Sequence, residues 1–281
     1  MARPVYQRRP PHFQNQLGRY RAAGYNVRGA VIDTKGLIAI AIGCTPGSGS
    51  RVLRDILDTS PQVHMDPGFD PKTKDSIGSR SFLHSKDRSP ETISSHIEKF
   101  VAEIIGSIPD GRLGQYRYFG WKNPNNIRFI DLLFEILPGF RFLHLLRDPA
   151  ALARGRRQSK MYRDRLKMGA IAPGTSRKRD SLEQWQSLNL PVWRTYRDQP
   201  NYLVVHYEDI IMRPAETVRA VFGWLGVQAF DLEAALASIA PPPDPISRGN
   251  GVDVSIIAEA CELLGYGYRL RRESTDAPFA V

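Results

Sequence analysis

Short apolar runs alternate along this chain with longer segments in which apolar residues recur at helical spacing. The runs have the length and composition of strands buried on both faces, and they lie at residues 37–42, 62–65, 118–121, 140–146 and 202–207. Between them, residues 91–105 carry Ile93, Ile97, Val101 and Ile104 in phase for one face of a helix. This alternation predicts an α/β fold, a single domain with a central parallel sheet flanked by helices.

Further helices are indicated by capping residues and apolar periodicity. Asp148 and Pro149 have the residue types of an N-cap and a first helical position, so a helix is expected to begin there. The other predicted helices lie around residues 52–57, 126–137, 182–196, 214–225, 232–240 and 253–264. Residues 66–90 are polar and are expected to form a long loop. The prolines of residues 241–245 are expected to form a rigid break between helices.

The boundaries of the domain follow from these elements. We expect one α/β domain over residues 36–270, preceded by a basic arm at 1–35 and followed by a tail at 271–281. The basic N-terminus lacks the apolar stretch of a secretory signal, and the run at 37–42 is far shorter than the about 20 residues that span a bilayer. Cys44 and Cys261 are too few for a disulfide framework or a zinc cluster. A cytoplasmic protein without a membrane span is expected.

The net charge of +10 is concentrated in two segments. Residues 1–32 hold six arginines and no acidic residue, and residues 151–179 hold ten Lys and Arg against Asp164 alone. Nucleic-acid-binding proteins have such segments, but no helix-turn-helix, RNP-like or zinc pattern accompanies them, so nucleic acid is not the expected partner. An anionic small molecule would also be attracted by this charge.

One loop has a composition that simple packing does not require. In GCTPGSGSRVLRDIL, residues 43–57, a proline and small residues connect a strand to a helix, which lets backbone N–H groups approach an anion at the helix N-terminus. The ATP-binding pattern G-x-x-x-x-G-K-[ST] does not fit, because from Gly43 the required Gly and Lys fall on Ser48 and Gly49. The pattern G-x-G-x-x-G is absent, which disfavours a dinucleotide oxidoreductase. A tight connection without a ligand is the alternative.

Three segments in this order resemble the sulfotransferase family, enzymes that transfer a sulfuryl group from 3′-phosphoadenosine-5′-phosphosulfate (PAPS). They are TPGSGSRVLRDILDTSP, WKNPNNIRFIDLLFEILPGFRFLHLLRDPAALARG and NYLVVHYEDIIMRPAETVRAVFGWLG, and together they cover roughly residues 37–226. The resemblance implies a sulfotransferase fold similar to that of P-loop NTPases. In the family the first motif holds the 5′-phosphosulfate, and the Arg of R-D-P in the second binds the 3′-phosphate.

The resemblance implies a set of nucleotide-binding residues. By position, Ser48, Gly49, Ser50 and Arg51 would hold the 5′-phosphosulfate and Arg147 the 3′-phosphate. Arg147 also has a physical argument of its own, because a planar guanidinium at the end of an apolar strand suits phosphate better than core packing. An ion pair with Asp148 is the alternative. The full expected set is Gly47, Ser48, Gly49, Ser50, Arg51, Val52, Arg147, Gly155, Arg156 and Arg248.

The chain departs from the family pattern at three positions. The Lys or Arg before Ser-Gly is Gly47, the second Thr of the loop is Arg51, and the Ser that usually follows the R-D-P arginine by eight residues is Gly155. The residues beside it, Arg154, Arg156 and Arg157, could each reach the 3′-phosphate instead. Two interpretations stay open: Arg51 and Lys122 supply the missing charge in a working enzyme, or the protein binds nucleotide as a catalytically silent binding or scaffold module.

Sulfuryl transfer also needs a base for the proton of the acceptor. Asp66, in HMDPG, is the first candidate, with His64 and Asp70 behind it, although HMDPG is also an ordinary turn sequence and His64 could face the core. The six histidines show no metal-ligand spacing, so no metal is expected. Trp121, Trp185 and Trp193 could stack on a ligand, with core packing the commoner outcome, and Tyr207, Glu208 and Asp209 are expected to organise a strand-to-helix turn.

The acceptor is expected to be a small molecule or a glycan with a hydroxyl or amine group. The segments at 66–90 and 156–180 flank the site in this topology and are expected to form lids over the acceptor. The basic charge of the second segment favours an anionic acceptor. A homodimer is a further expectation.

Overall fold

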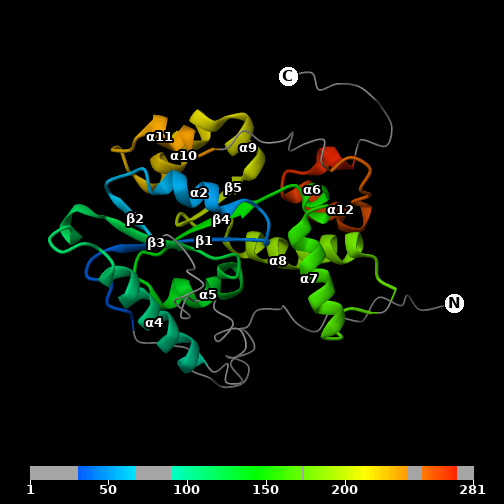
Figure 1. Cartoon of the computed structure of the whole chain (residues 1–281), viewed down its shortest axis with the longest axis horizontal. Helices are drawn as coiled ribbons and strands as arrows, with labels where there is room; N and C mark the ends of the chain where they lie inside the picture. The colour runs from blue at the N-terminus through cyan, green and yellow to red at the C-terminus, as the bar shows by residue number, and fades with distance from the viewer. Residues whose placement is uncertain (1–30, 67–89, 173, 240–248, 271–281) are drawn as a thin grey trace.

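A five-stranded parallel sheet forms the centre of the protein (Figure 1). The computed structural model describes residues 31–66, 90–172, 174–239 and 249–270, so the predictions for most of the basic arm, the 66–90 loop, the break at 241–245 and the tail lie outside the described residues. The strand order is β2-β3-β1-β4-β5, and every neighbouring pair is parallel. The strands are β1 (Ile38–Cys44), β2 (Val63–Met65), β3 (Tyr118–Lys122), β4 (Arg141–Leu146) and β5 (Tyr202–His206). The predicted α/β fold is confirmed.

Helices cover both faces of the sheet because its strands are apolar on both faces. In β1, Ile40 and Ile42 pack toward one group of helices, while Ala39 and Ala41 pack toward the other. The first group, which lies above the sheet in Figure 1, consists of α2 (Ser50–Leu57), α9 (Tyr207–Met212), α10 (Pro214–Leu225) and α11 (Leu232–Ala237). The second consists of α4 (Pro90–Gly106), α5 (Asn126–Ile136) and α8 (Arg177–Tyr196).

A third apolar cluster extends the domain beyond the end of β4. It contains residues of α6 (Pro149–Ala153), α8, the 3-10 turn η3 (Ser255–Ile257) and α12 (Ala258–Leu263). The chain then forms η4 (Gly267–Arg269), and a further turn, η1 (Leu113–Gln115), precedes β3. The C-terminal part of the described chain therefore packs against the segment that follows β4.

The structure differs from the predicted elements in several places, one of which is the helix predicted at 253–264, where the structure has η3 followed by the short helix α12. The basic segment after Gly155 forms the helix α7 (Arg156–Lys167), which apolar periodicity could not reveal because Gln158 is the one side chain that this helix buries. Helix α8 begins at Arg177, earlier than predicted, because the Ser176 hydroxyl caps it. The predicted strand at 202–207 ends at His206, and Tyr207 begins α9.

The strand order places one topological switch point at the carboxyl end of the sheet, between β1 and β4. The connection after β1 leads to β2 at one edge, whereas the connection after β4 leads to β5 at the other edge. Ligands of open α/β sheets bind outside the strands at such a switch point. Among the described helices, none combines the length and the apolar character needed to cross a membrane.

Candidate functional site

The loop after β1 presents backbone N–H groups. Gly47 and Gly49 have φ angles of 103° and 91°, which glycine adopts readily, and Gly49 is the N-cap of α2. No side chain caps this helix, and its first turn contains no acidic residue. Among the described residues, the amides of Gly47, Gly49, Ser50 and Arg51 have no hydrogen-bond acceptor. Unpaired amides at a positive helix end form a cradle for an anion.

Hydrogen bonds to the loop hold this cradle in place. The buried Ser48 hydroxyl donates to the carbonyl of Thr45 at 2.7 Å, so its hydrogen is used inside the loop. The Gln158 amide of α7 donates to the carbonyl of Pro46 at 2.7 Å, and Asn189 Nδ2 of α8 donates to Thr45 Oγ1 at 2.9 Å. The loop is thus anchored by two helices that come from a different part of the sequence.

A chain of buried polar side chains runs from the sheet to the base of the loop, and it was not predicted from the sequence. His144 Nε2 donates to Asn189 Oδ1 at 2.8 Å, and the His144 Nδ1 accepts from the Tyr202 hydroxyl. Burial lowers the pKa of His144 to about 4, while the bond with Asn189 opposes this shift. The neutral imidazole therefore orients Asn189, which holds Thr45.

Arg147, directly after β4, reaches the same loop. Its Nη1 donates to the carbonyl of Gly47 at 3.0 Å, and the guanidinium carbon lies 4.2 Å from the centre of the Tyr207 ring. The ring also packs on Gly49, where an added Cβ would come within 2.4 Å of it. Arg147 Nε is buried and has no hydrogen-bond partner among the described residues. A buried, unpartnered donor of a guanidinium beside exposed amides fits an anionic ligand.

The turn that carries Arg147 is fixed by residues from the C-terminal part of the chain. Asp148 caps α6 by accepting from the amide of Ala150 at 2.8 Å, and its carboxylate also accepts from Arg269 Nε at 2.6 Å and from the Tyr268 hydroxyl at 3.1 Å. The alternative considered from the sequence, an Arg147–Asp148 ion pair, is not found, because Arg269 is the partner of this carboxylate.

Glu208 secures the same turn from the start of α9. Its carboxylate accepts from the amide of Asp148 at 3.0 Å and from the Tyr266 hydroxyl at 3.0 Å. Burial raises the pKa of Glu208, and the bond from the Asp148 amide counteracts this shift. Glu208 therefore fixes the turn between β4 and α6, whereas from the sequence it was expected to organise the turn that follows its own strand.

A second helix N-terminus approaches the loop. Gly155 is the N-cap of α7 without a side-chain cap, and the first turn holds Arg156 and Arg157 and no acidic residue. An added Cβ on Gly47 would lie 3.6 Å from the Cβ of Arg157, so α7 begins beside the loop. The positive ends of α2 and α7 therefore converge on one region.

Lys122 and Arg51 lie on the other side of the loop, toward β3. Lys122 ends β3 opposite Ile42 of β1, and its side chain is half-buried. Burial, followed by the nearby charge of Arg51, lowers the pKa of Lys122. Arg51 is exposed in the first turn of α2. The structure thus brings together Arg51 and Lys122, the two cations predicted from the sequence to replace the positive charge that is missing at Gly47.

The two candidate bases that the structure describes lie near each other, since the charge of Asp66 acts on His64. The amide of Asp66 donates to Gly120 of β3 at 2.8 Å, which places Asp66 beside the strand that ends in Lys122. His64 faces Ser107 Oγ at 3.1 Å, and burial lowers its pKa. The register puts His64 level with Ala39, about 16 Å of strand before Cys44, so His64 is not brought to the loop. Asp70 and Arg248 lie outside the described residues.

The tryptophans and cysteines of the described chain serve packing. Trp121 and Trp185 are buried in the core, and the Trp185 indole donates to the carbonyl of Arg147 at 3.0 Å. Trp193 is half-buried, with the guanidinium of Arg197 4.7 Å from its ring centre. Burial raises the pKa of Cys44 to about 11, so this thiol stays protonated. In the ranges that the structure describes, no group of three His, Cys, Asp or Glu side chains could hold a metal ion.

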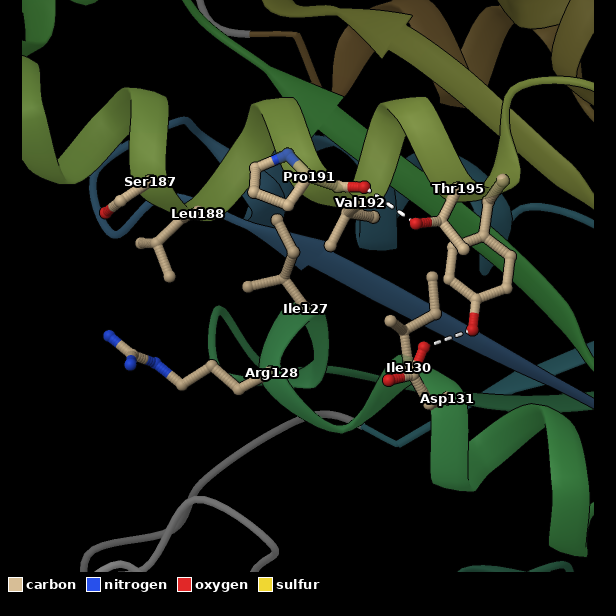
Figure 2. Close-up of a pocket in the computed structure, with 10 residues that line it drawn as sticks. Ile127, Arg128, Ile130, Asp131, Ser187, Leu188, Pro191, Val192 and Thr195 are labelled. Carbon is tan, nitrogen blue, oxygen red and sulfur yellow. Dashed lines mark hydrogen bonds between the residues drawn. The ribbon is translucent and has the colours of Figure 1, made fainter. Parts of the chain in front are cut away.

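A small cavity of about 100 Å³ lies between α5 and α8 (Figure 2). Figure 2 shows Arg128 and Asp131 at opposite ends of it, with Leu188 and Val192 between them. The Tyr196 hydroxyl donates to Asp131, and the Thr195 hydroxyl donates to the carbonyl of Pro191 at 2.9 Å. The cavity lies on the α5 and α8 side of the sheet, opposite α2, so it is distinct from the anion cradle.

Comparisons with known proteins identify the family of this chain. The model of the sulfotransferase family matches residues 39–231, more than half of the chain. Protein-tyrosine sulfotransferase 1 of Danio rerio is 22% identical over 251 residues, which are 85% of this chain and 65% of that protein, so the chain spans less than two thirds of this relative.

Two solved structures show weaker similarity. The sulfotransferase domain of the Synechococcus PCC 7002 olefin synthase is 19% identical, with a TM-score of 0.48 over 90% of this chain and 92% of that one. The mouse sulfotransferase SULT7A1 complexed with PAP is 14% identical, with a TM-score of 0.41 over 76% of this chain and 67% of that one. The order and direction of the strands carry the fold assignment independently of these scores.

Proposed function

Since the chain belongs to the sulfotransferase family, we propose that it transfers the sulfuryl group of PAPS to a hydroxyl or amine of a small-molecule or glycan acceptor. The observation that carries this proposal is the hydrogen bond from Arg147 Nη1 to the carbonyl of Gly47. It brings the side chain that we propose as the phosphate ligand to the cradle of unpaired amides, although the two residues are 100 positions apart. A nucleotide with anionic groups at both ends needs such a pair of sites.

The residues present fit the two ends of PAPS. The amides of the loop and of the first turn of α2 would hold the 5′-phosphosulfate, as anions are held at helix N-termini. The free Nε of Arg147 would donate to the 3′-phosphate, with the first turn of α7 at Gly155 and Arg156 beside it. The Tyr207 ring supports both groups, because it packs on Gly49 and under the Arg147 guanidinium.

The reaction would be an in-line displacement at sulfur. The acceptor oxygen or nitrogen forms a bond to sulfur while the bond between sulfur and the bridging oxygen breaks, and that electron pair stays on the bisphosphate nucleotide that leaves. Charge builds on the bridging oxygen, so fixed amides and cations at the loop stabilise the transition state. Arg51 and Lys122 would contribute from the side of β3.

The proton of the acceptor would pass to Asp66. This carboxylate follows β2 and is held beside β3 by the bond between its amide and Gly120, on the side of the loop where Lys122 lies. General-base assistance by a positioned carboxylate is typically worth about 10²–10⁴-fold in rate. The exposed basic residues of α7 favour an anionic acceptor.

Calorimetric titration with adenosine 3′,5′-bisphosphate tests the proposal. We expect micromolar binding by the wild-type protein and a loss of about 10–100-fold in Arg147→Ala, because charge-assisted hydrogen bonds are removed. Arg141→Ala is the matched control, since Arg141 lies at the other end of β4 and also stacks on an aromatic ring, that of Trp224. Absence of binding by the wild-type protein at millimolar nucleotide would overturn the proposal. Binding without turnover on any acceptor would identify a catalytically silent relative.

A further inference from the structure

The loop cannot easily carry a cation of its own at residue 47. The backbone of Gly47 has a φ of 103°, where L side chains are strained. An added Cβ would also lie 3.3 Å from Leu152 Cδ2, a shorter distance than most Cβ atoms in proteins have to their neighbours. The space that a side chain at this position would enter is already bordered by α6 and α7.

Arg157 begins in that same space. Its Cβ lies 3.6 Å from the position of the added Cβ on Gly47, so the side chain of Arg157 starts directly beside the place where a side chain of residue 47 would start. The next residue, Gln158, donates to the carbonyl of Pro46 at 2.7 Å and fixes this turn of α7 against the loop. Arg157 is exposed, and among the described residues no carboxylate forms an ion pair with it. Arg157 therefore begins beside the loop and has no ion-pair partner among the described residues.

The location of Arg157 in its helix points to an anionic partner. A cation in the first turn of a helix lies at the positive end of the helix dipole, which is unfavourable without a compensating charge. The first turn of α7 has no acidic residue and no side-chain cap that would provide one. An anion bound between α2 and α7 would attract the charge of Arg157 and offset its repulsion by the positive end of the helix dipole.

We propose that Arg157 supplies the positive charge beside Gly47 and interacts with the sulfuryl end of PAPS, at the oxygen that bridges phosphorus and sulfur. As the acceptor bonds to sulfur, the bond from sulfur to that oxygen breaks and leaves its electron pair there, where the Arg157 guanidinium compensates the charge. Arg51 and Lys122 lie on the β3 side of the loop, so Arg157 acts from the opposite side. This inference rests on the proposed use of PAPS.

The test compares two nucleotides in Arg157→Ala, using the full chain. The affinities for PAPS and for adenosine 3′,5′-bisphosphate are measured by calorimetry. Turnover is measured with labelled PAPS on any acceptor that the wild-type protein sulfates. We expect Arg157→Ala to weaken PAPS binding about 10-fold more than bisphosphate binding and to lower turnover about 10²–10³-fold. Arg157→Lys recovers most of both quantities. Arg219→Ala, an exposed arginine on α10, leaves both unchanged and serves as the control.

The outcomes separate this inference from the function on which it rests. If the wild-type protein binds neither nucleotide, the use of PAPS is wrong. If it binds both, and Arg157→Ala weakens them equally or not at all, Arg157 does not contact the sulfuryl end and the inference is wrong. Turnover within about 3-fold of the wild-type value in Arg157→Ala would also overturn it.

Discussion

Arg269 forms a buried ion pair with Asp148, the residue that directly follows Arg147, although the two partners lie 121 positions apart in the chain. Their side chains are 3% and 0% exposed. Arg269 also donates to Asn250 Oδ1 at 3.3 Å, and it packs so closely on Gly249 that an added Cβ would lie 2.7 Å from its Nη2. The C-terminal turn thus holds the backbone that carries Arg147, the residue proposed to bind the 3′-phosphate.

Arg269→Met is expected to destabilise the protein strongly. It leaves the Asp148 carboxylate buried without its cation, which costs about 3–5 kcal/mol in comparable cases. Urea unfolding of the full chain measures the loss. Arg194→Ala, which breaks the exposed Arg194–Glu259 pair, is the control and should cost less than about 1 kcal/mol. Equal losses in the two variants would contradict the assigned importance of the buried pair.

Gly49→Ala should impair both stability and nucleotide binding. The variant places a methyl group 2.4 Å from the Tyr207 ring in addition to straining a φ of 91°. Gly111→Ala separates the two effects, because Gly111 has a φ of 75° but open space around it. We expect Gly111→Ala to lose about 1 kcal/mol in urea unfolding and Gly49→Ala to lose more. Bisphosphate affinity should fall in Gly49→Ala alone; unchanged affinity there would argue against the loop as the anion site.

Asp66→Asn should lower turnover while leaving nucleotide affinity near the wild-type value. The amide cannot accept the proton of the acceptor, so a loss of about 10²–10⁴-fold is expected in sulfation measured with labelled PAPS. His64→Gln is the matched control, because His64 is two residues earlier but faces Ser107. A large loss in His64→Gln and none in Asp66→Asn would reverse the proposed assignment of the base.

The buried His144 should make the folded state sensitive to acid. Its pKa is lowered to about 4, whereas in the unfolded chain it is near 6.5, so below about pH 6.5 the unfolded chain binds a proton that the folded protein does not. The contribution is fully present above pH ~6.5 and is lost as the pH falls toward 4, with about 2 kcal/mol lost at pH ~5.

Urea unfolding of the wild-type protein and His144→Gln, at about pH 7.5 and about pH 5, isolates this effect. The groups around the imidazole are the Tyr202 hydroxyl and the Asn189 amide, and the nearby charge of His206 also lowers the pKa of His144. Gln removes the titrating group, so the variant should lose less stability between the two pH values. The same pH dependence in both proteins would exclude His144 as its source.

The sheet and its main helices could be predicted because their residues carry local signals. The apolar run that became β4 and the Asp148-Pro149 pair that begins α6 both behaved as their composition indicates. Helix α7 was missed because a helix that buries only Gln158 has no apolar stripe. Its stability comes from contacts with the loop and α8, which no window of sequence contains.

The main residues of the candidate site could be predicted from the sequence, but the residues that hold them in place could not. The loop and Arg147 were found from motifs, and the structure brings them into contact. The partners that hold them, namely Asn189, Tyr207 and Arg269, come from segments that are remote in sequence, so spacing could not associate them. The place of Arg157 beside Gly47 likewise depends on how α7 packs.

The ion pair between Asp148 and Arg269 can form only after the ribosome has made both residues. Asp148 leaves the exit tunnel well before Arg269 does, so a growing polypeptide can build the strands while this carboxylate still lacks its counterion. The support of Arg147 is therefore completed only once Arg269 has been made, and a product that terminates before Arg269 would lack the buried counterion of Asp148.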